Sequence, residues 1–402
     1  MAAPPLHSSA STPPREASES SKFLRGAQLW RRILLLVLIL AILAGLVYWR
    51  LRYDLRAYAL LARFTKPKSQ GLVLSWQTNP IAITNLAIPA AGGSIPARLY
   101  LPVGVAHPPG VVIAHGIHHL GFDDPRFVNL ARALSGVGLV VLTPAIASLA
   151  DYRVDSGCIA IIGDSAEWLE ARLGRGPVTV IGISFSGGLA LMAAAEPRYQ
   201  PYVRAVVSLG GYDDLGRVAR FLATSQEEYP DGKFVPHAAH DYGAAVFVYG
   251  HLPQFFVPAD LPDAREALRY YLWEQPERAA PFLPRLSPAG RETMEILLAR
   301  KIELLRPRLL AAIQQDQGEL AALSPRGHIA ALQAPIFLLH GSEDSVIPPA
   351  ETLWLRNEVP HKELKDVLIT PLFSHVDLNG SAKRWDKIRL VQFMGRVLRA
   401  AD

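Results

Sequence analysis

Short, almost wholly apolar runs recur along the chain from about Gly71 onward, and most are followed by a turn and a helical pattern. In chain order they read GVVIAHG, LVVLTPA, VTVIGIS, AVVSLGG, APIFLLHG and DVLITP. Strands this apolar cannot expose either face to solvent, so they indicate a mostly parallel sheet with helices on both faces. Residues 81–102 alternate in polarity on either side of Gly92 and Gly93, which predicts a hairpin. The sequence therefore predicts an α/β fold, in which chemistry lies at the carboxyl ends of strands.

The first seventy residues differ in composition from the rest. Residues 1–32 begin rich in Pro, Ser and Ala, and we expect a disordered tail. Residues 33–49 are uncharged and end at Tyr48 and Trp49, as is typical of a transmembrane helix. A cleaved signal peptide is the alternative, although no Ala-x-Ala-like site precedes the charged residues after the run. We expect a single-pass membrane protein with residues 50–70 as a juxtamembrane linker, and basic residues on both sides of the run leave its orientation open.

The charge and cysteine content exclude some classes of function. The formal net charge is +5, but the excess of basic over acidic residues is mostly confined to the first seventy positions, so we do not expect a nucleic-acid partner. Cys158 is the single cysteine of the chain. An intramolecular disulfide and a cysteine-based zinc site are therefore impossible.

Two serines in VTVIGISFSGGLAL, residues 178–191, fit the pattern of a nucleophile on a sharp turn from strand to helix. Such a turn is crowded and needs small residues two positions before and after the serine. Gly182 and Ser186 meet this need for Ser184. Ser184 and Gly188 meet it for Ser186. Because the apolar run ends at Ile181, Ser184 falls at the tip of the turn and is our predicted nucleophile; helix capping is the alternative role of these serines.

Two further strand ends carry residues that could act with this serine. The run ending in HGSEDSVIP places Asp344 after one strand, and LITPLFSHVD places His375 after the last. The order Ser184, Asp344, His375, together with the early motif P-x-V-V-x-x-H-G and the late motif H-G-x-x-D-x-x-x-P, resembles the α/β-hydrolase superfamily, in particular its esterase and peptidase-like branch. The resemblance covers about residue 81 to the C-terminus. One departure is Ser186, where the family usually has glycine.

The resemblance implies a serine hydrolase with a Ser-His-Asp triad, acting on an ester, thioester or amide without a cofactor or metal ion. Ser184 would attack the acyl carbon, His375 would carry the proton, and Asp344 would orient the imidazole. Glu343 is the rival acid. The backbone N–H groups of Phe185 and Ile117 would stabilise the oxyanion.

A histidine cluster supports a second interpretation. His115, His118 and His119 lie within five residues, and three imidazoles could hold a metal ion for hydrolysis. The cluster lies on a predicted loop, however, and we prefer His118 and His119 as polar lining of a pocket mouth. A third interpretation is a hydrolase-fold protein that only binds ligands, since fold does not guarantee chemistry.

Residues 215–330 form a long insertion between two predicted strands, with helical patterns and an aromatic stretch from Tyr242 to Phe256. The resemblance implies a helical cap over the strand ends. We expect a small-molecule or lipid-like acyl substrate. Some of the aromatics, Phe255 and Phe256 among them, would face Ser184, and others would form the core of the cap.

Overall fold

The computed structural model describes residues 16–90, 93–373 and 383–402, with side chains from residue 30 onward. The chain divides into two compact units, Met1–Arg52 and Tyr53–Asp402.

Helix α1 (Glu16–Thr65) makes up the described part of the first unit and continues into the second. Its segment from Trp30 onward is long and apolar enough to cross a membrane, and the most apolar part is not buried. By the same test a signal sequence would also qualify. The part of the expected tail between residues 16 and 32 is helical rather than disordered, because α1 begins at Glu16.

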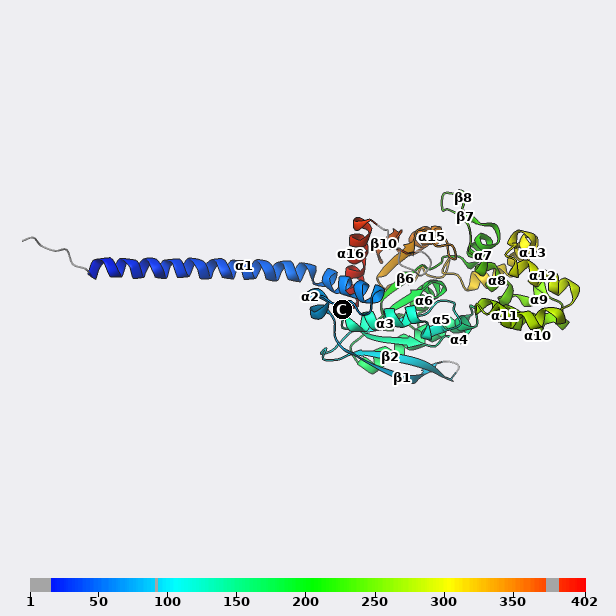
Figure 1. The fold of residues 1–402 in the computed structure, drawn as a ribbon, viewed down its shortest axis with the longest axis horizontal. Helices are drawn as coiled ribbons and strands as arrows, with labels where there is room; N and C mark the ends of the chain where they lie inside the picture. The colour runs from blue at the N-terminus through cyan, green and yellow to red at the C-terminus, as the bar shows by residue number, and fades with distance from the viewer. Residues whose placement is uncertain (1–15, 91–92, 374–382) are drawn as a thin grey trace, which may run out of the picture. The chain divides into compact units, whose positions relative to one another are not determined.

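The second unit is built on one eight-stranded sheet with the strand order β1-β2-β4-β3-β5-β6-β9-β10 (Figure 1). The hairpin β1–β2 is antiparallel, as predicted, and β2 also pairs antiparallel with β4. The remaining pairs are parallel, as the apolar runs predicted. The strands are β1 (Ile81–Ala90), β2 (Gly93–Pro102), β3 (Gly110–Ala114), β4 (Val140–Pro144), β5 (Val178–Ile183), β6 (Val203–Leu209), β9 (Ile336–Gly341) and β10 (Leu364–Thr370).

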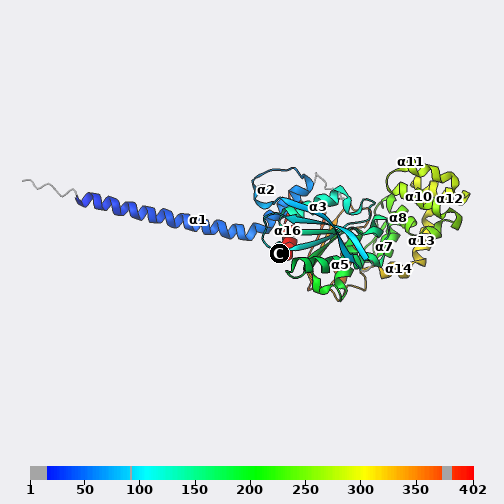
Figure 2. The same ribbon diagram turned by 90° about the horizontal axis from the view of Figure 1, so that it is seen from below.

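Helices cover both faces of the sheet (Figure 2). In β3, Val112 and Ala114 pack into the core under α5 (Ser156–Leu173) and α6 (Phe185–Ala195). Val111 and Ile113 point the other way, into the core with α3 (Pro125–Gly136) and α16 (Arg384–Ala401). This is why the strands read as continuous apolar runs instead of alternating ones. The other helices outside the insertion are α2 (Leu72–Gln77), α4 (Ala147–Ala150) and α15 (Ala350–Glu358).

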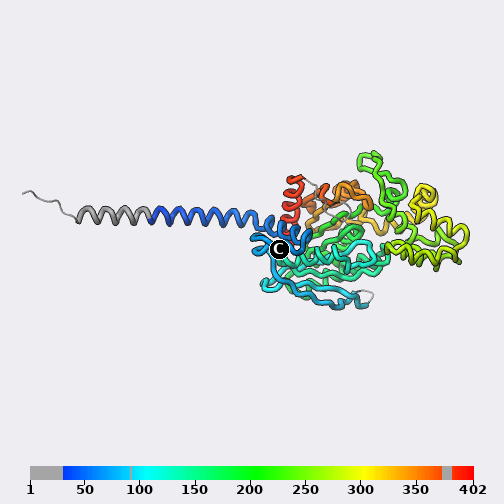
Figure 3. The backbone as a smooth tube through the Cα atoms, in the orientation of Figure 1, coloured from blue at the N-terminus to red at the C-terminus, as the bar shows by residue number. Residues whose placement is uncertain are grey.

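The insertion between β6 and β9 forms a mostly helical cap at one end of the sheet (Figure 3). It follows the carboxyl end of β6, so it lies at the edge where the candidate residues gather. Its elements are α7 (Leu215–Thr224), β7 (Gln226–Glu228), β8 (Phe234–Pro236), α8 (Asp241–Gly250), α9 (Leu252–Phe255), α10 (Leu261–Leu272), α11 (Pro276–Ala279), α12 (Pro288–Leu298), α13 (Ile302–Gln315) and α14 (Gln317–Ala322).

The segment expected to be a linker, residues 50–70, is part of the folded unit from Tyr53 onward. Tyr53, Ala57 and Leu60 are buried in the core that contains α3 and α16. The Arg56 guanidinium also donates to the backbone oxygen of Val137. These residues recur at helical spacing, so α1 packs one face on the domain before it ends at Thr65.

Two truncations should therefore differ in stability. Deleting residues 1–52 should leave the free energy of unfolding of the second unit nearly unchanged. Deleting residues 1–68 should lower it by about 2–5 kcal/mol or more, because the side chains of Tyr53 and Leu60 leave unfilled space in the core. Urea unfolding followed by circular dichroism measures both. Equal unfolding midpoints would show that the end of α1 adds nothing to the fold.

Candidate active site

Ser184 occupies a strained turn between β5 and α6. Its backbone angles are φ 56° and ψ −129°, a region that residues with a side chain rarely adopt. Its N–H donates to the backbone oxygen of Leu209 at 2.7 Å, which ties the turn to the end of β6. Gly182 is required here, because a Cβ at that position would overlap the backbone oxygen of Ser186. The turn thus holds a serine, 9% exposed, at the carboxyl edge of the sheet.

Ser186 lies two residues further on and has a different environment. Its side chain is fully buried, and its Oγ accepts a hydrogen bond from the Ile183 N–H at 2.8 Å. The same hydroxyl lies 2.8 Å from the backbone oxygen of Ala114, to which it can donate. Ser186 therefore cross-links β3 and β5 below the turn, and its hydroxyl satisfies buried backbone groups that a glycine would leave without this partner.

Asp344 lies in the loop after β9 and is buried. Its Oδ1 accepts hydrogen bonds from the N–H groups of Val346 at 2.9 Å and Ile347 at 3.1 Å. Its Oδ2 lies 3.6 Å from Nε2 of His340. The neighbouring Glu343 is exposed, so Asp344 is the carboxylate that the loop holds rigidly.

Gly210 connects the positions of Ser184 and Asp344. It follows Leu209, the acceptor of the Ser184 N–H, and its own N–H donates to Leu339 of β9. A Cβ on Gly210 would lie 3.5 Å from Oδ2 of Asp344. The ends of β5, β6 and β9 are adjacent, so the two predicted residues share one edge of the sheet.

His375 lies outside the described residues. The chain is described up to Phe373, after the end of β10. There it passes so close to Gly341 that a Cβ on this glycine would overlap the backbone oxygen of Phe373. The described chain therefore runs beside the base of the Asp344 loop two residues before His375.

The predicted oxyanion donors are Phe185, which follows Ser184, and Ile117, whose neighbour Gly116 lies close to Ser184. Phe185 is the first residue of α6, so its N–H has no acceptor within the helix. Ile117 follows Gly116, where a Cβ would lie 3.0 Å from the Cβ of Ser184. Gly116 thus allows the loop after β3 to approach the serine closely.

His115 is a buried structural residue rather than a metal ligand. Its Nε2 accepts from the Ile146 N–H at 3.1 Å, so its Nδ1 carries the proton and donates to the Gly116 oxygen at 2.8 Å. Both ring nitrogens are therefore engaged with the backbone. Within the described ranges, no group of three or more His, Cys, Asp or Glu side chains is arranged to hold a metal ion. The ligand set that the metal interpretation needs does not form.

Burial lowers the pKa of His115 to about 4, despite its hydrogen bond to Gly116. The unfolded chain, with the ordinary pKa of 6.5, takes up a proton as the pH falls below that value, whereas the folded chain does not until about pH 4. The contribution of neutral His115 to the free energy of unfolding is thus fully present above pH 6.5 and is lost as the pH falls toward 4. Between pH 7 and pH 5, the free energy of unfolding should fall by about 2 kcal/mol more in wild type than in His115→Gln. Urea titrations at both pH values measure this, and equal losses in the two proteins would contradict it.

His119 contacts the cap, and His118 lies beside His119. Nδ1 of His118 lies 3.4 Å from Oδ2 of Asp124, and the His119 ring lies 5.5 Å from that of Trp273 in the cap. Burial lowers the pKa of both histidines. The loop that carries the predicted oxyanion donor is therefore in contact with the cap.

Sequence reasoning found the aromatic stretch of the cap but missed the contacts that its start makes with the rest of the domain. The His240 N–H donates to the backbone oxygen of Ser345, beside Asp344, at 2.8 Å. Tyr242 lies edge-on to Tyr152, whose hydroxyl donates to Leu272 at 2.7 Å. Burial raises the pKa of Tyr152 to about 12. Their only signal in the sequence is a polar start to the aromatic stretch, which fixes no partner.

Phe255 and Phe256 are buried residues of the cap. Arg308 lies over the Phe255 ring while donating to its backbone oxygen. These contacts agree with the alternative expectation that aromatics of this stretch form the core of the cap.

Comparisons with known proteins place the chain among related folds. A family model described as alpha/beta hydrolase fold matches residues 143–369, which include Ser184 and Asp344. No curated protein matches the chain. The structure is similar to the esterase domain of a Rhodothermus marinus protein, at 16% identity over 79% of this chain and 97% of that chain, with a TM-score of 0.42. It is also similar to a Pyrobaculum calidifontis esterase, at 14% identity over 88% of this chain and 92% of that one, with a TM-score of 0.43.

Proposed function

Because the chain belongs to the α/β-hydrolase fold family, we propose that it is a serine hydrolase that cleaves a carboxylic ester, thioester or amide. The observation that carries the proposal is the left-handed backbone of Ser184 at the turn from β5 to α6. A strained, partly accessible serine at this edge has no structural task, since Ser186 makes the buried hydrogen bonds. A protein that only bound ligands would gain nothing from the strain.

The proposed reaction proceeds in two steps. Ser184 Oγ attacks the acyl carbon while His375 removes its proton, and the tetrahedral oxyanion accepts hydrogen bonds from the N–H groups of Phe185 and Ile117. The carbon–heteroatom bond then breaks, and His375 returns the proton to the departing alcohol, thiol or amine. Water, deprotonated by His375, hydrolyses the acyl-enzyme and restores Ser184.

Asp344 is the proposed third member of the triad. Two backbone N–H groups fix its Oδ1, and in the proposed triad its Oδ2 would accept a hydrogen bond from His375. A carboxylate oriented in this way holds the imidazole in one tautomer and stabilises the imidazolium that forms during attack.

The enzyme is proposed to act at a membrane, anchored by α1. The truncations described above test this point too. The full chain should stay in the membrane pellet at alkaline pH, whereas protein lacking residues 1–52 should be released. Release of the full chain would contradict the anchor.

The experiment that tests the activity is a substrate panel. Full-length protein in neutral detergent should hydrolyse p-nitrophenyl esters. The panel contains esters with acyl chains of rising length, together with the matched thioesters and amides. The hydrolysis rates then rank the three substrate classes. Each added methylene that enters an apolar pocket should favour binding by about 0.8 kcal/mol until the pocket is full. If the protein turned over no substrate of the panel and a fluorophosphonate did not label it, the result would favour a hydrolase-fold protein that only binds ligands.

A further inference from the structure

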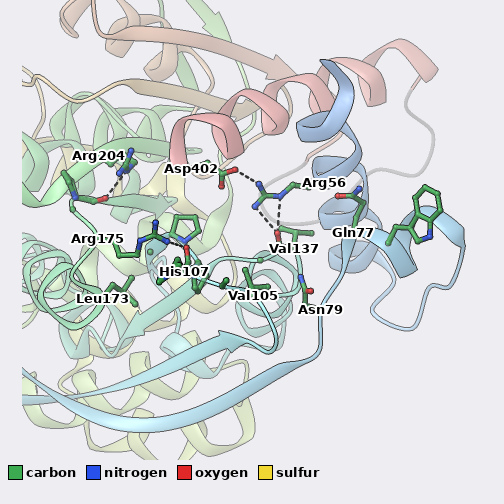
Figure 4. A pocket seen from close by; sticks show the side chains of 18 residues that line it. Arg56, Gln77, Asn79, Val105, His107, Val137, Leu173, Arg175, Arg204 and Asp402 are labelled. Carbon is green, nitrogen blue, oxygen red and sulfur yellow. Dashed lines mark hydrogen bonds and ion pairs between the residues drawn. The ribbon is translucent and has the colours of Figure 1, made fainter. Parts of the chain in front are cut away.

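Figure 4 shows a cavity of about 420 Å³. It lies at the amino ends of the strands, whereas Ser184 lies at the carboxyl edge of the sheet. Residues at or just before the amino ends of strands line it, among them Gly110 of β3, Pro177 before β5 and Arg204 of β6. The proposed hydrolase reaction uses none of them. The cavity therefore needs a separate explanation.

Three arginines line the cavity, and backbone oxygens hold their guanidinium groups. Arg204 Nε donates to the Pro177 oxygen at 3.1 Å, and Arg175 donates to the oxygen of His107 (Figure 4). Arg56 donates to Val137 and also pairs with Asp402 at 2.6 Å. A guanidinium fixed by one or two nitrogens presents its remaining donors in a set direction, a geometry that suits the oxygens of a phosphate.

The charge balance of the lining favours an anionic ligand. Among the described residues that line the cavity, Asp402 is the one acidic residue, and it already faces Arg56. Arg175 and Arg204 line the same cavity, Arg204 donates to Pro177, two residues after Arg175, and the lining offers neither arginine a carboxylate other than Asp402. A bound anion would neutralise this excess of positive charge in the lining.

An exposed apolar surface borders the cavity. Trp76 of α2 lines it and is 75% exposed, and Leu72, one helical turn earlier, is 70% exposed. Apolar side chains that are exposed next to one another can mark an interaction surface, and tryptophan is enriched where proteins meet the lipid headgroups. Lys66 and Lys68 precede α2 and are exposed as well.

The cavity is close in the sequence to the candidate membrane span. Arg56 follows Trp49, the end of the apolar run, by seven residues. Even fully extended, such a segment spans at most about 25 Å. If α1 crosses a bilayer, the cavity lies within reach of the headgroup layer.

We propose that this cavity binds a phosphate group, and that the headgroup of an anionic membrane phospholipid supplies it. Arg175 and Arg204 bind the phosphate oxygens, and Trp76 and Leu72 contact the lipid surface around the headgroup. The proposal does not depend on catalysis by Ser184.

The test uses full-length protein in neutral detergent, with lipid that the enzyme cannot hydrolyse. Diether phosphatidylglycerol, added to about tenfold above its dissociation constant, should raise the melting temperature by about 2–4 °C. The diether glycerol that lacks the phosphate should not. The double variant Arg175→Gln/Arg204→Gln should lose the shift, whereas Arg172→Gln, an exposed arginine of α5 outside the cavity, should keep it.

The outcomes separate the site from the source of the phosphate. A shift with phosphatidylglycerol that persists in the double variant would overturn the site. A shift with glycerol 3-phosphate of equal size, also lost in the double variant, would support the phosphate site but overturn the lipid as its source. No shift in wild type with either compound would overturn both. The same shift in Ser184→Ala keeps this result separate from any failure of the proposed activity.

Discussion

Replacing Ser184 by alanine is expected to lower kcat for ester hydrolysis by at least about 10⁴-fold, with the fold intact. The proposed acyl-enzyme cannot form without the hydroxyl, and only the oxyanion donors and substrate binding would remain to accelerate the reaction. The strained turn should relax slightly or not at all, because alanine at this position meets the same backbone angles. Steady-state kinetics on the best ester of the panel measures the loss.

Ser186→Ala is the matched control for this prediction. It removes the hydroxyl that accepts from the Ile183 N–H, so it should lower the free energy of unfolding by about 1–3 kcal/mol. Its reactivity toward a fluorophosphonate should nevertheless persist. Loss of activity in Ser186→Ala at a temperature where the variant is folded, with activity retained in Ser184→Ala, would reverse the assignment.

Asp344→Asn is expected to have the second-largest effect, a fall in kcat of about 10⁴-fold. The amide can keep its oxygen on the N–H groups of Val346 and Ile347, so the loop should hold its shape. The amide nitrogen then replaces Oδ2 and donates a proton where the carboxylate would accept one, which favours the wrong tautomer of His375.

Glu343→Gln is the control for the acid. Glu343 is exposed, and its substitution should change kcat by less than a few fold. If Glu343→Gln lost activity and Asp344→Asn kept it, the neighbouring carboxylate would be the working acid and the burial of Asp344 would be structural only.

The parallel sheet could be predicted because strands that are buried on both faces consist almost wholly of apolar residues. Val111 to Ala114 are all buried, two toward each core, and so the run contains no polar residue. The hairpin was equally visible, because β1 and β2 lie beyond the doubly covered strands and keep partial alternation.

The boundary at the start of the domain could not be placed from the sequence. Residues 53–65 carry charges between apolar positions, which suits a surface helix and a packed helix alike. The deciding facts are long-range ones: Tyr53 and Leu60 meet the core beside α16, and Arg56 reaches Val137. The sequence around residues 53–65 does not identify these distant partners.

The candidate site was likewise predictable only in part. The turn at Ser184 was visible from small residues at fixed offsets, because steric crowding acts within a few positions. The cap contacts of His240 and Tyr242 join segments about a hundred residues apart, so their spacing in the sequence holds no information. The role of Ser186 also depends on Ala114, a residue of another strand.

The most direct test of the proposed function is to map where a fluorophosphonate binds covalently. Full-length protein labelled in neutral detergent should be digested and analysed by tandem mass spectrometry, since only an activated hydroxyl forms the phosphonyl adduct. The peptide that contains residues 178–191 should carry the adduct on Ser184, and the adduct should be absent from His375→Ala. An adduct on Ser186, or labelling that is unchanged in Ser184→Ala, would contradict the assignment of the nucleophile.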